Sequence, residues 1–393
     1  MTLLASSAGT SWLTKGSEAA VITIFIDGNY NQDVILFAGE KAKLFQYGVF
    51  LGKFETGNHK VDITLNRERS PGKIKKDSIA EISFEIFATS SNQKNADDMA
   101  RQYSPFIYAR PNSIDKFSDI PLIVYYEILD GPSGSKRIIY SVIFSHEDGG
   151  TRGKALMARW GRMTDIEWIY EVNLDANGNK ITDIYQGANH ETKTFEGKRA
   201  FGLHPLFYNA TDNNNFADSG CSSLRFAPSA VRADLSKGSR ETLMEKFPWT
   251  YRIMSEEIIR ENRIGNDPKD ADKIFDPRDY AYVEIYAEQS STAISVELDS
   301  ADGKTNSSDL GIRELRVARK GYFRIAILNP TKDFPKFVRL RCHAAGEAAK
   351  ENCKSVRVVK VVMLDETFLP KEIVFPLSTK QIKPGNVVII SRE

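Results

Sequence analysis

The sequence has few cysteines, no long apolar run and almost no net charge. Its 393 residues include three cysteines, and 53 Lys and Arg residues balance 52 Asp and Glu residues. A chain without excess positive charge has no overall field that would attract a nucleic acid or an anionic membrane. The longest apolar stretches, such as residues 20–26, are far shorter than the roughly 20 residues that a membrane-spanning helix needs. We therefore expect no nucleic-acid partner and no transmembrane segment.

The sequence also lacks the best-known catalytic and nucleotide-binding signatures. It contains no Gly-x-Ser-x-Gly, no Walker A motif, no His-Glu-x-x-His and no Cys-x-x-Cys. These motifs mark α/β-hydrolases, NTPases, zincins and thioredoxin-like proteins, respectively. The sequence gives no support to those classes and does not by itself identify a reaction.

What is present is the composition of a folded protein with several domains. Hydrophobic residues make up 41% of the chain and charged residues 27%, which is ordinary globular composition. A chain of this length is expected to form two or three cores. Runs of β-branched and aromatic residues between turn residues form three strand-rich blocks. We predict a mainly β, multi-domain protein with an N-terminal β-sandwich at 1–104, a central β domain with a helix at 105–265 and a C-terminal β-sandwich at 266–393.

One segment has the periodicity of a helix. Between residues 239 and 262, apolar side chains recur every three or four positions, which is typical of an amphipathic helix. We expect this stripe to face a core, and its members are Met244, Phe247, Tyr251, Met254 and Ile258.

Two of the three cysteines flank a short polar insert between strand-like runs. Cys342 and Cys353 stand at strand ends that can face each other, within the Cα separation that a disulfide requires. The alternative is two buried free thiols. A disulfide would indicate an oxidising compartment, and we expect an extracytoplasmic protein on that basis, with a cytoplasmic one as the alternative. Residues 1–12 show no signal peptide, so either it was removed or there never was one.

The strongest local signal is a hairpin around Asn177 and Gly178. Asn-Gly between two alternating runs predicts a two-residue turn, and the turn then fixes which residues face each other. This register places Asp165 opposite His190. Strict alternation places Asp165, Glu167 and Glu171 on one face and leaves the other face for the core.

Acidic side chains and an imidazole on one face suggest a metal site. Carboxylates two residues apart on a strand are close enough to bind one cation together with a histidine from the neighbouring strand. Asp165, Glu167 and His190 are therefore candidate ligands for Ca²⁺, Mn²⁺ or Zn²⁺. Further candidate ligands lie at the end of the preceding hairpin, namely His146, Glu147 and Asp148.

The same residues also have a simpler interpretation. A half-exposed strand normally carries polar side chains on its wet face, where acidic groups pair with residues such as Lys180 or Arg162. A bulge near Gly187 would move His190 to the other face and separate the three ligands.

Part of this region resembles a known family. Residues 137–191 contain Tyr-Ser-Val-Ile-Phe at 140–144, Thr-Asp-Ile-Glu-Trp at 164–168 and Asn-His-Glu at 189–191. This order is similar to the central β-sandwich of the necrosis-inducing toxins and their vacuolar-sorting-type relatives. It departs from the toxins because the Gly-His-Arg-His run is missing and Trp168 follows Glu167. The resemblance implies that Asp165, Glu167 and His190 help to hold a cation that binds a membrane glycolipid head group.

Two functions are compatible with these observations. The first is a non-catalytic, extracytoplasmic binding protein with a divalent-cation site in the central β domain, whose ligand is a glycan, a lipid head group or a protein surface. The second is a metal-dependent hydrolase that uses the same acidic and histidine residues to activate water. A catalytic metal would need an open coordination position, whereas a structural cation would be closed off.

Overall fold

The computed structural model divides the chain into two compact units. Unit 1 consists of residues 1–150 and 164–234, and unit 2 consists of residues 151–163 and 235–393. Of the three expected parts, 1–104 and most of 105–265 form one unit here, whereas the segments 151–163 and 239–262 belong with the C-terminal sheets. The described residues are 1–39, 44–72, 76–83, 95–110, 117–147, 149–267, 269–299, 303, 305–345 and 351–392.

The protein is mainly β, as the sequence predicts. Strands account for 43% of the chain and helices for 13%, and the strands form several separate sheets. Within the described part of the chain, no helix has the length and apolar character needed to span a membrane.

Unit 1 begins with two small three-stranded sheets. Their strand orders are β4-β1-β6 and β3-β2-β5. The hairpin between β2 and β3 turns at Asp27 and Gly28, whose φ angles are 51° and 77°. Positive φ at both central residues is typical of a type I′ turn, which an Asp-Gly pair favours. The strands are β1 (Thr2–Ala8), β2 (Val21–Ile26), β3 (Asn29–Ile35), β4 (Phe45–Gly48), β5 (Val61–Leu65) and β6 (Lys76–Ser83).

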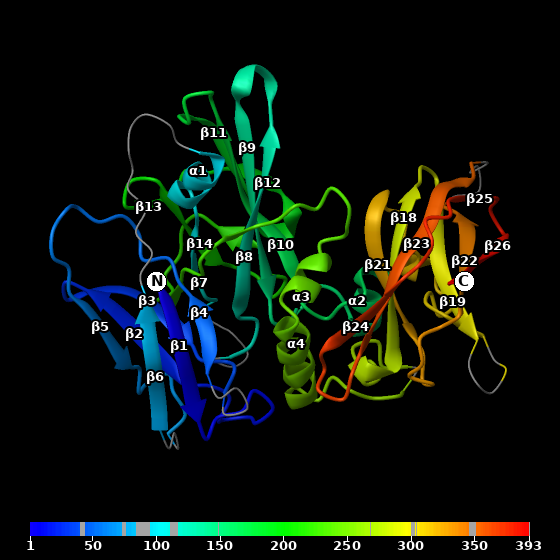
Figure 1. Cartoon of the computed structure of the whole chain (residues 1–393), viewed down its shortest axis with the longest axis horizontal. Coiled ribbons are helices and arrows are strands. Elements are labelled where there is room, and N and C mark those ends of the chain that lie inside the picture. The colour runs from blue at the N-terminus through cyan, green and yellow to red at the C-terminus, as the bar shows by residue number, and fades with distance from the viewer. Residues whose placement is uncertain are drawn as a thin grey trace. The chain divides into compact units, whose positions relative to one another are not determined.

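The larger part of unit 1 contains a six-stranded and a five-stranded sheet. The six-stranded sheet has the order β12-β11-β10-β9-β8-β17, and its long strands lie side by side in Figure 1. The five-stranded sheet has the order β13-β14-β7-β16, with β15 paired to β14. The strands are β7 (Phe106–Tyr108), β8 (Pro121–Asp130), β9 (Lys136–Phe144), β10 (Ile166–Leu174), β11 (Lys180–Gln186), β12 (Thr192–Thr194), β13 (Arg199–Ala200), β14 (His204–Asn209), β15 (Phe216–Ala217), β16 (Arg225–Phe226) and β17 (Val231–Arg232).

Both sheets and the helix α1 (Ala96–Gln102) contribute to one aromatic core. Tyr140 and Tyr170 from the large sheet and Phe207 and Phe216 from the other are buried there. The ring centroids of Tyr170 and Phe207 lie 5.6 Å apart, within the range of favourable aromatic contacts. This core fixes the strands that lead to the candidate site.

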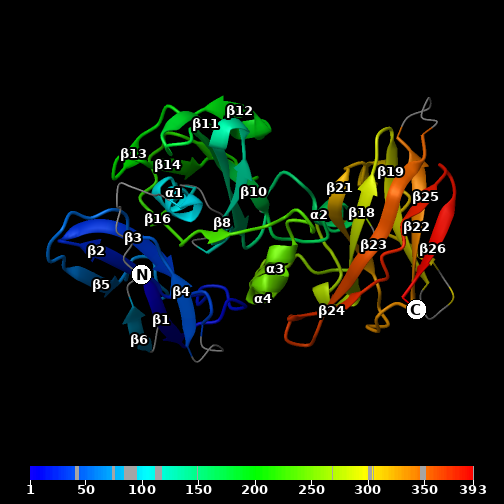
Figure 2. The ribbon, with the colours of Figure 1, turned by 45° about the horizontal axis from the view of Figure 1, so that its top comes forward.

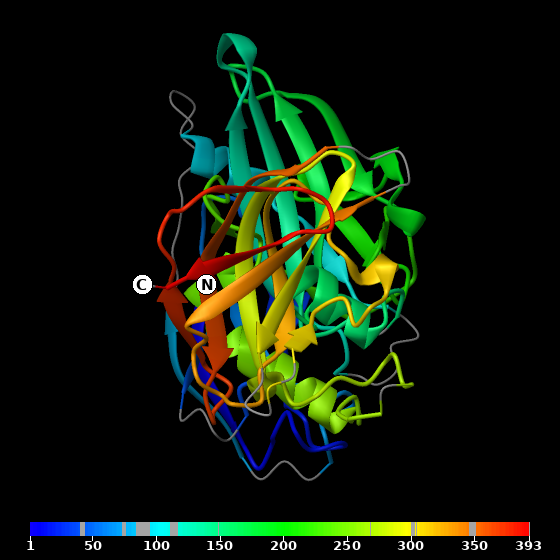
Figure 3. The same ribbon diagram turned by 90° about the vertical axis from the view of Figure 1, so that its right-hand side faces the viewer.

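Unit 2 is a β-sandwich with helices packed beside it. One sheet has the order β21-β18-β23-β24 with β25 paired to β23, and the other has the order β20-β19-β22-β26. Side chains from both sheets form a single core, and the strands are seen from two directions in Figures 2 and 3. The elements are α2 (Gly153–Trp160), α3 (Thr242–Lys246), α4 (Trp249–Arg260), β18 (Tyr280–Glu288), β19 (Thr292–Asp299), β20 (Thr305–Ser307), β21 (Gly321–Leu328), β22 (Phe337–Ala344), β23 (Cys353–Leu364), β24 (Pro370–Val374), β25 (Lys380–Ile382) and β26 (Val387–Ser391); short 3-10 turns are η1 (Pro132–Gly134) and η2 (Ala188–His190) in unit 1 and η3 (Pro277–Asp279) and η4 (Arg313–Leu315) here.

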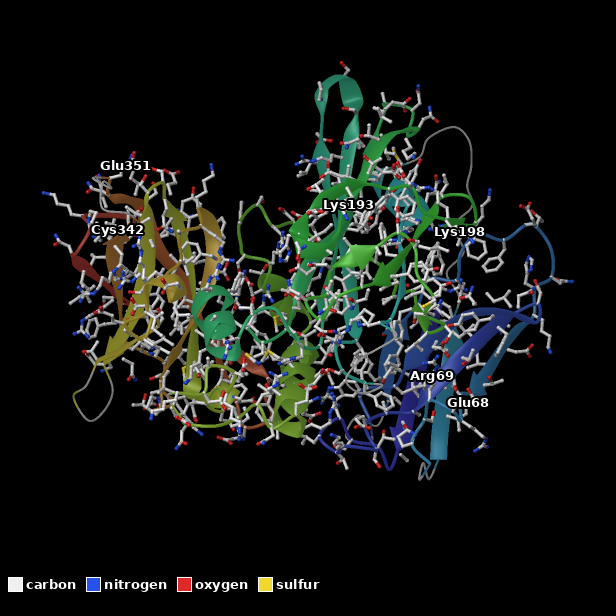
Figure 4. All side chains as sticks on the ribbon, turned by 180° about the vertical axis from the view of Figure 1, so that it is seen from behind. Glu68, Arg69, Lys193, Lys198, Cys342 and Glu351 are labelled. Atoms are coloured by element: carbon white, nitrogen blue, oxygen red, sulfur yellow. A yellow bond between two sulfur atoms is a disulfide. The ribbon has the colours of Figure 1, made fainter. Side chains whose placement is uncertain are left out.

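Two features of unit 2 correspond to sequence expectations. The apolar stripe faces the interior, because Met244, Tyr251, Met254 and Ile258 are all fully buried and only Phe247 is half-buried. In the sandwich, the two cysteines at the ends of β22 and β23 are joined by a disulfide across a Cα separation of 6.0 Å, and one of them is labelled in Figure 4. The third cysteine is free and exposed.

A buried ion network connects α3 and α4 to the β18–β21 sheet. The guanidinium of Arg324 is completely buried and donates to Glu245 Oε2 at 3.0 Å, to Glu284 Oε2 at 2.7 Å and to the hydroxyl of Tyr251 at 2.6 Å. Lys360 Nζ lies 3.1 Å from Glu245 Oε2. These polar partners are far apart in the sequence, so the helices belong to this unit through contacts that no local pattern reveals.

Candidate functional site

The predicted hairpin of β10 and β11 forms, but its tip is not the expected two-residue loop. The N–H of Gly178 donates to Asp175 O at 3.0 Å, and the N–H of Asp175 donates to Asn179 O at 2.9 Å. Asp175 Oδ1 also accepts from the N–H groups of Asn177 and Asn179. These bonds close a three-residue turn in which Gly178 has a φ of 80°. The Asn-Gly pair thus marks the turn but does not form it alone.

A register shift next to the turn restores the predicted pairing. The shift lies between Asn173 and Leu174. On the side away from the turn, Glu171 faces Ile184, as the sequence predicts. The ladder ends before it reaches Asp165 and His190, which therefore are not a cross-strand pair. Their positions depend on the loops that follow the strands.

A β-bulge changes which face the acidic residues occupy. The pairing of β10 with β9 is irregular between Trp168 and Tyr170, where one extra residue enters β10. Before the bulge, Glu167 pairs with Val142, which belongs to the aromatic core. After the bulge, Tyr170 occupies that core face and Glu171 points to the other face, because paired residues of a ladder share a face. The prediction that Glu171 shares a face with Glu167 is therefore wrong.

Asp165 is buried at the end of the large sheet. It is 2% exposed, and its Oδ2 accepts from Asn214 Nδ2 at 3.1 Å. Asn214 is fully buried and its Oδ1 accepts in turn from Asn209 Nδ2 at 2.5 Å. The predicted ligand Asp165 is thus part of a chain of buried side-chain hydrogen bonds, which holds the loop at 211–215 against the strand end.

Glu167 and His190, the other two predicted ligands, lie close together. His190 Nδ1 is 3.9 Å from Glu167 Oε2. Gln186 links them, because its amide nitrogen donates to Glu167 Oε2 and lies 3.2 Å from His190 Nδ1. The imidazole is 54% exposed, whereas the carboxylate is only 15% exposed. The imidazole is therefore accessible from solvent, with the carboxylate behind it.

The exposed imidazole is surrounded by amides. The side-chain amide of Asn213 lies 3.0 Å from His190 Nε2, and that of Asn215 lies 3.4 Å from His190 Nδ1. The structure places amide nitrogens beside both ring nitrogens. A neutral imidazole accepts at only one of them, so the amide beside the other must turn its oxygen towards the ring N–H. Gln186, His190, Asn213 and Asn215 are called the amide rim below.

The backbone around the amide rim is held in unusual conformations. Asn189 and His190 have φ angles of 58° and 60°, and Asn214 has a φ of 48°. Residues other than glycine rarely adopt these angles, and such strain is often concentrated at functional sites. Gly150 packs closely against this loop. Its φ is 89°, and a Cβ at this position would come within 2.5 Å of Asn213 Oδ1. The surrounding structure therefore fixes the position of the rim closely.

The further candidate ligands at the end of β9 are also buried. His146 is 1% exposed and Glu147 is 5% exposed. Asp148 lies outside the described residues. Within the rim, His190 is exposed and Asn213 is half-buried, whereas Gln186 and Asn215 are buried like His146 and Glu147.

An arginine supports the opposite end of the same loop. Arg110 is buried and donates from Nη1 to Asp212 Oδ1 at 2.5 Å. Its Nη2 lies 3.5 Å from Asp119 Oδ2, a carboxylate that is buried, unlike that of Asp212. The loop at 211–215 is therefore fixed by the ion pair of Asp212 with Arg110 and by the hydrogen bond of Asn214 to Asp165.

The three predicted metal ligands do not converge. Glu167 and His190 approach each other, but Asp165 is engaged by Asn214. Among the residues that the structure describes, no group of three His, Cys, Asp or Glu side chains is placed to hold a metal ion. The binding of a cation by these residues stays a prediction, and oxygen atoms from the amide rim would have to complete its ligand set.

Comparisons with known proteins give this site no family. No protein-family model matches the chain, and no curated protein matches it either. The resemblance to the toxin family is therefore neither supported nor contradicted by a relative.

Proposed function

We propose that unit 1 is a non-catalytic glycan-binding module whose ligand contacts the amide rim and Glu167. The observation that carries this proposal is an exposed imidazole whose two nitrogens both face side-chain amides. Amides and a neutral imidazole present donors and acceptors side by side. Sugar hydroxyls both donate and accept, so they suit such a surface.

The charge of the rim favours a glycan over a phosphate head group. None of the four rim residues is Lys or Arg, and the carboxylate of Glu167 beside His190 would repel a phosphate. A carboxylate readily accepts hydrogen bonds from sugar hydroxyls. The strained backbone at Asn189 and His190 supports the same proposal, because this strain pre-positions side chains at an accessible surface.

A location outside the cytoplasm is part of the proposal. The bond between Cys342 and Cys353 supports it, since structural disulfides persist mainly in oxidising compartments.

The resemblance of residues 137–191 to toxins that bind glycolipids is a second, independent argument for a carbohydrate ligand.

Binding to a glycan array, followed by calorimetry with the selected glycan, tests the proposal. His190→Ala and Asn213→Ala should each weaken binding at least tenfold, because each removes part of the rim. His59→Ala is the matched control, since His59 is another histidine of unit 1 that pairs with a carboxylate, that of Asp27 at 2.7 Å. Its binding should be unchanged. If the wild-type chain selects no glycan, or if both rim variants bind as the wild type does, the proposal is wrong.

The same calorimetry separates this function from the metal-dependent hydrolase. Titration with CaCl₂, MnCl₂ or ZnCl₂ should give heat in the wild type and less heat in Glu167→Gln if a cation takes part in binding. Incubation of the selected glycan with the protein and each metal should leave the glycan intact. Metal-dependent cleavage would support the hydrolase and contradict a non-catalytic module.

A further inference from the structure

Unit 2 contains a segment with positive charge and no acidic residue. Residues 151–163 include four Lys or Arg residues and no Asp or Glu. Three of these four cations have partners outside the segment. Arg152 lies 3.6 Å from Asp272 Oδ2, Lys154 donates to a backbone carbonyl, and Arg162 lies 2.9 Å from Glu241 Oε1. The fourth, Arg159, lies at the end of α2.

Arg159 and Arg319 share one aromatic side chain. Their guanidinium carbons lie 4.3 Å and 5.1 Å from the ring centroid of Trp160, within the range of cation–π contacts. Arg319 also donates to the backbone carbonyl of Arg159. Within the described residues, neither guanidinium has a carboxylate oxygen within 4.0 Å. Two positive groups thus contact the same ring, and neither forms an ion pair within the described residues.

The neighbourhood adds further positive charge. Burial and the charges of Arg162, Arg159 and Arg240 lower the pKa of Arg319 to about 10, against the opposing effect of Glu241. Three arginines therefore repel the charge of Arg319, although the residue is exposed. An anion between the guanidinium groups would relieve that repulsion and remain reachable from solvent.

Helix capping accounts for only part of this arrangement. A cation near a helix C-terminus is favourable by about 0.3–1 kcal/mol, and Arg319 has this position at the end of α2, which lies beside β21 in Figure 1. Capping requires one cation. It does not explain why Arg159 is held on the same tryptophan with no acidic partner.

We propose that Arg159 and Arg319, with Trp160, form an oxyanion-binding site for a phosphate or sulfate group of a ligand. The planar guanidinium fork matches tetrahedral oxyanions through paired hydrogen bonds. The site lies in unit 2 and does not depend on the glycan proposal for unit 1.

Calorimetry of the full chain at low ionic strength tests the site, with inorganic pyrophosphate and sodium sulfate as probes. The wild type should bind at least one of them saturably, and the anion that binds more tightly identifies the chemistry. Arg159→Gln and Arg319→Gln should each weaken binding at least tenfold. Arg313→Gln is the control, because Arg313 is an exposed arginine nearby that donates to a backbone carbonyl. Its affinity should stay within about twofold of the wild-type value.

Two results would overturn the site. The first is a wild type that binds neither probe saturably. The second is an equal loss of affinity in Arg313→Gln and Arg159→Gln, which would mean that binding follows overall charge. Circular dichroism and the melting temperature establish that each variant folds. If Arg319→Gln does not fold because its cap on α2 is lost, Arg159→Gln decides, since the Arg159 side chain does not make that capping bond.

Discussion

Arg324→Met should destabilise unit 2 more than any exposed arginine substitution. Arg324 is completely buried and neutralises the buried carboxylate of Glu284 and that of Glu245, whose side chain is 13% exposed. Methionine is uncharged, so the substitution leaves Glu284 without this cation. Glu284 keeps only the hydrogen bond that its Oε1 accepts from the Ser239 N–H at 3.0 Å, among those described above. Removing one partner of a buried ion pair typically costs about 3–5 kcal/mol, because the remaining charge stays desolvated. We expect a loss of this size at neutral pH.

The control is the same substitution at an exposed ion pair. Arg339 pairs with Asp299 on the surface of the sandwich, where both side chains are partly exposed. Arg339→Met should cost less than about 1 kcal/mol, the usual upper value for such pairs. Urea unfolding measures both variants, and hydrogen exchange of amides in β18 and β21 assigns the loss to unit 2. Equal losses in the two variants would refute the argument from burial.

The effect should also depend on pH. Burial alone would raise the pKa of Glu245, but the charges of Arg324 and Lys360 and the hydrogen bonds from Arg324 and Tyr251 outweigh it, so this pKa lies below 4.5. A lowered pKa in the folded state contributes stability above pH 4.5, and this contribution is lost as the pH falls through the folded value. The difference between wild type and Arg324→Met should therefore be largest near neutral pH and become smaller below pH 4.5. A difference that grows in acid would contradict this account.

Two further predictions concern unit 2. Met254→Ala should lower the free energy of unfolding in urea by about 2–5 kcal/mol, because Met254 is fully buried and the cavity cannot collapse completely. The control is Lys246→Ala at an exposed position, which should change this free energy by less than about 0.5 kcal/mol. Reduction of the bond between Cys342 and Cys353 should lower stability by roughly 3 kcal/mol, the value for a short closed loop, when unfolding is compared with and without reductant; an unchanged midpoint would mean that the bond adds no constraint.

The sequence predicted the fold class well because strands and tight turns have local signals. Asp27 and Gly28 mark a hairpin by themselves, and alternating runs mark the strands on either side. The assignment of the helices was less successful. The stripe around Met254 identified a buried helix, but its attachment to the C-terminal sheets rests on pairs such as Glu245 and Arg324, which are 79 residues apart. No local pattern contains such a pair.

The acidic strand illustrates a second limit. Strict alternation predicts the faces of Asp165, Glu167 and Glu171 only if every residue of the strand is paired one to one. The bulge between Trp168 and Tyr170 adds one residue, and neither Gly nor Pro marks it in the sequence. A bulge depends on the fit between strands, so its place is a tertiary property.

The amides of the candidate site were missed for a related reason. The Asp-Asn-Asn-Asn run at 212–215 is typical of a turn stabilised by its own side chains, and it does form local bonds, such as that from the Asn215 N–H to Thr211 Oγ1. The same turn directs its other amides towards residues distant in sequence, namely Asp165, 49 positions earlier, and His190, 25 positions earlier. An asparagine in a turn is common for local reasons alone. The carboxylates and the histidine therefore predict a site from the sequence alone. The amides that surround the imidazole become recognisable only when the fold brings them to it.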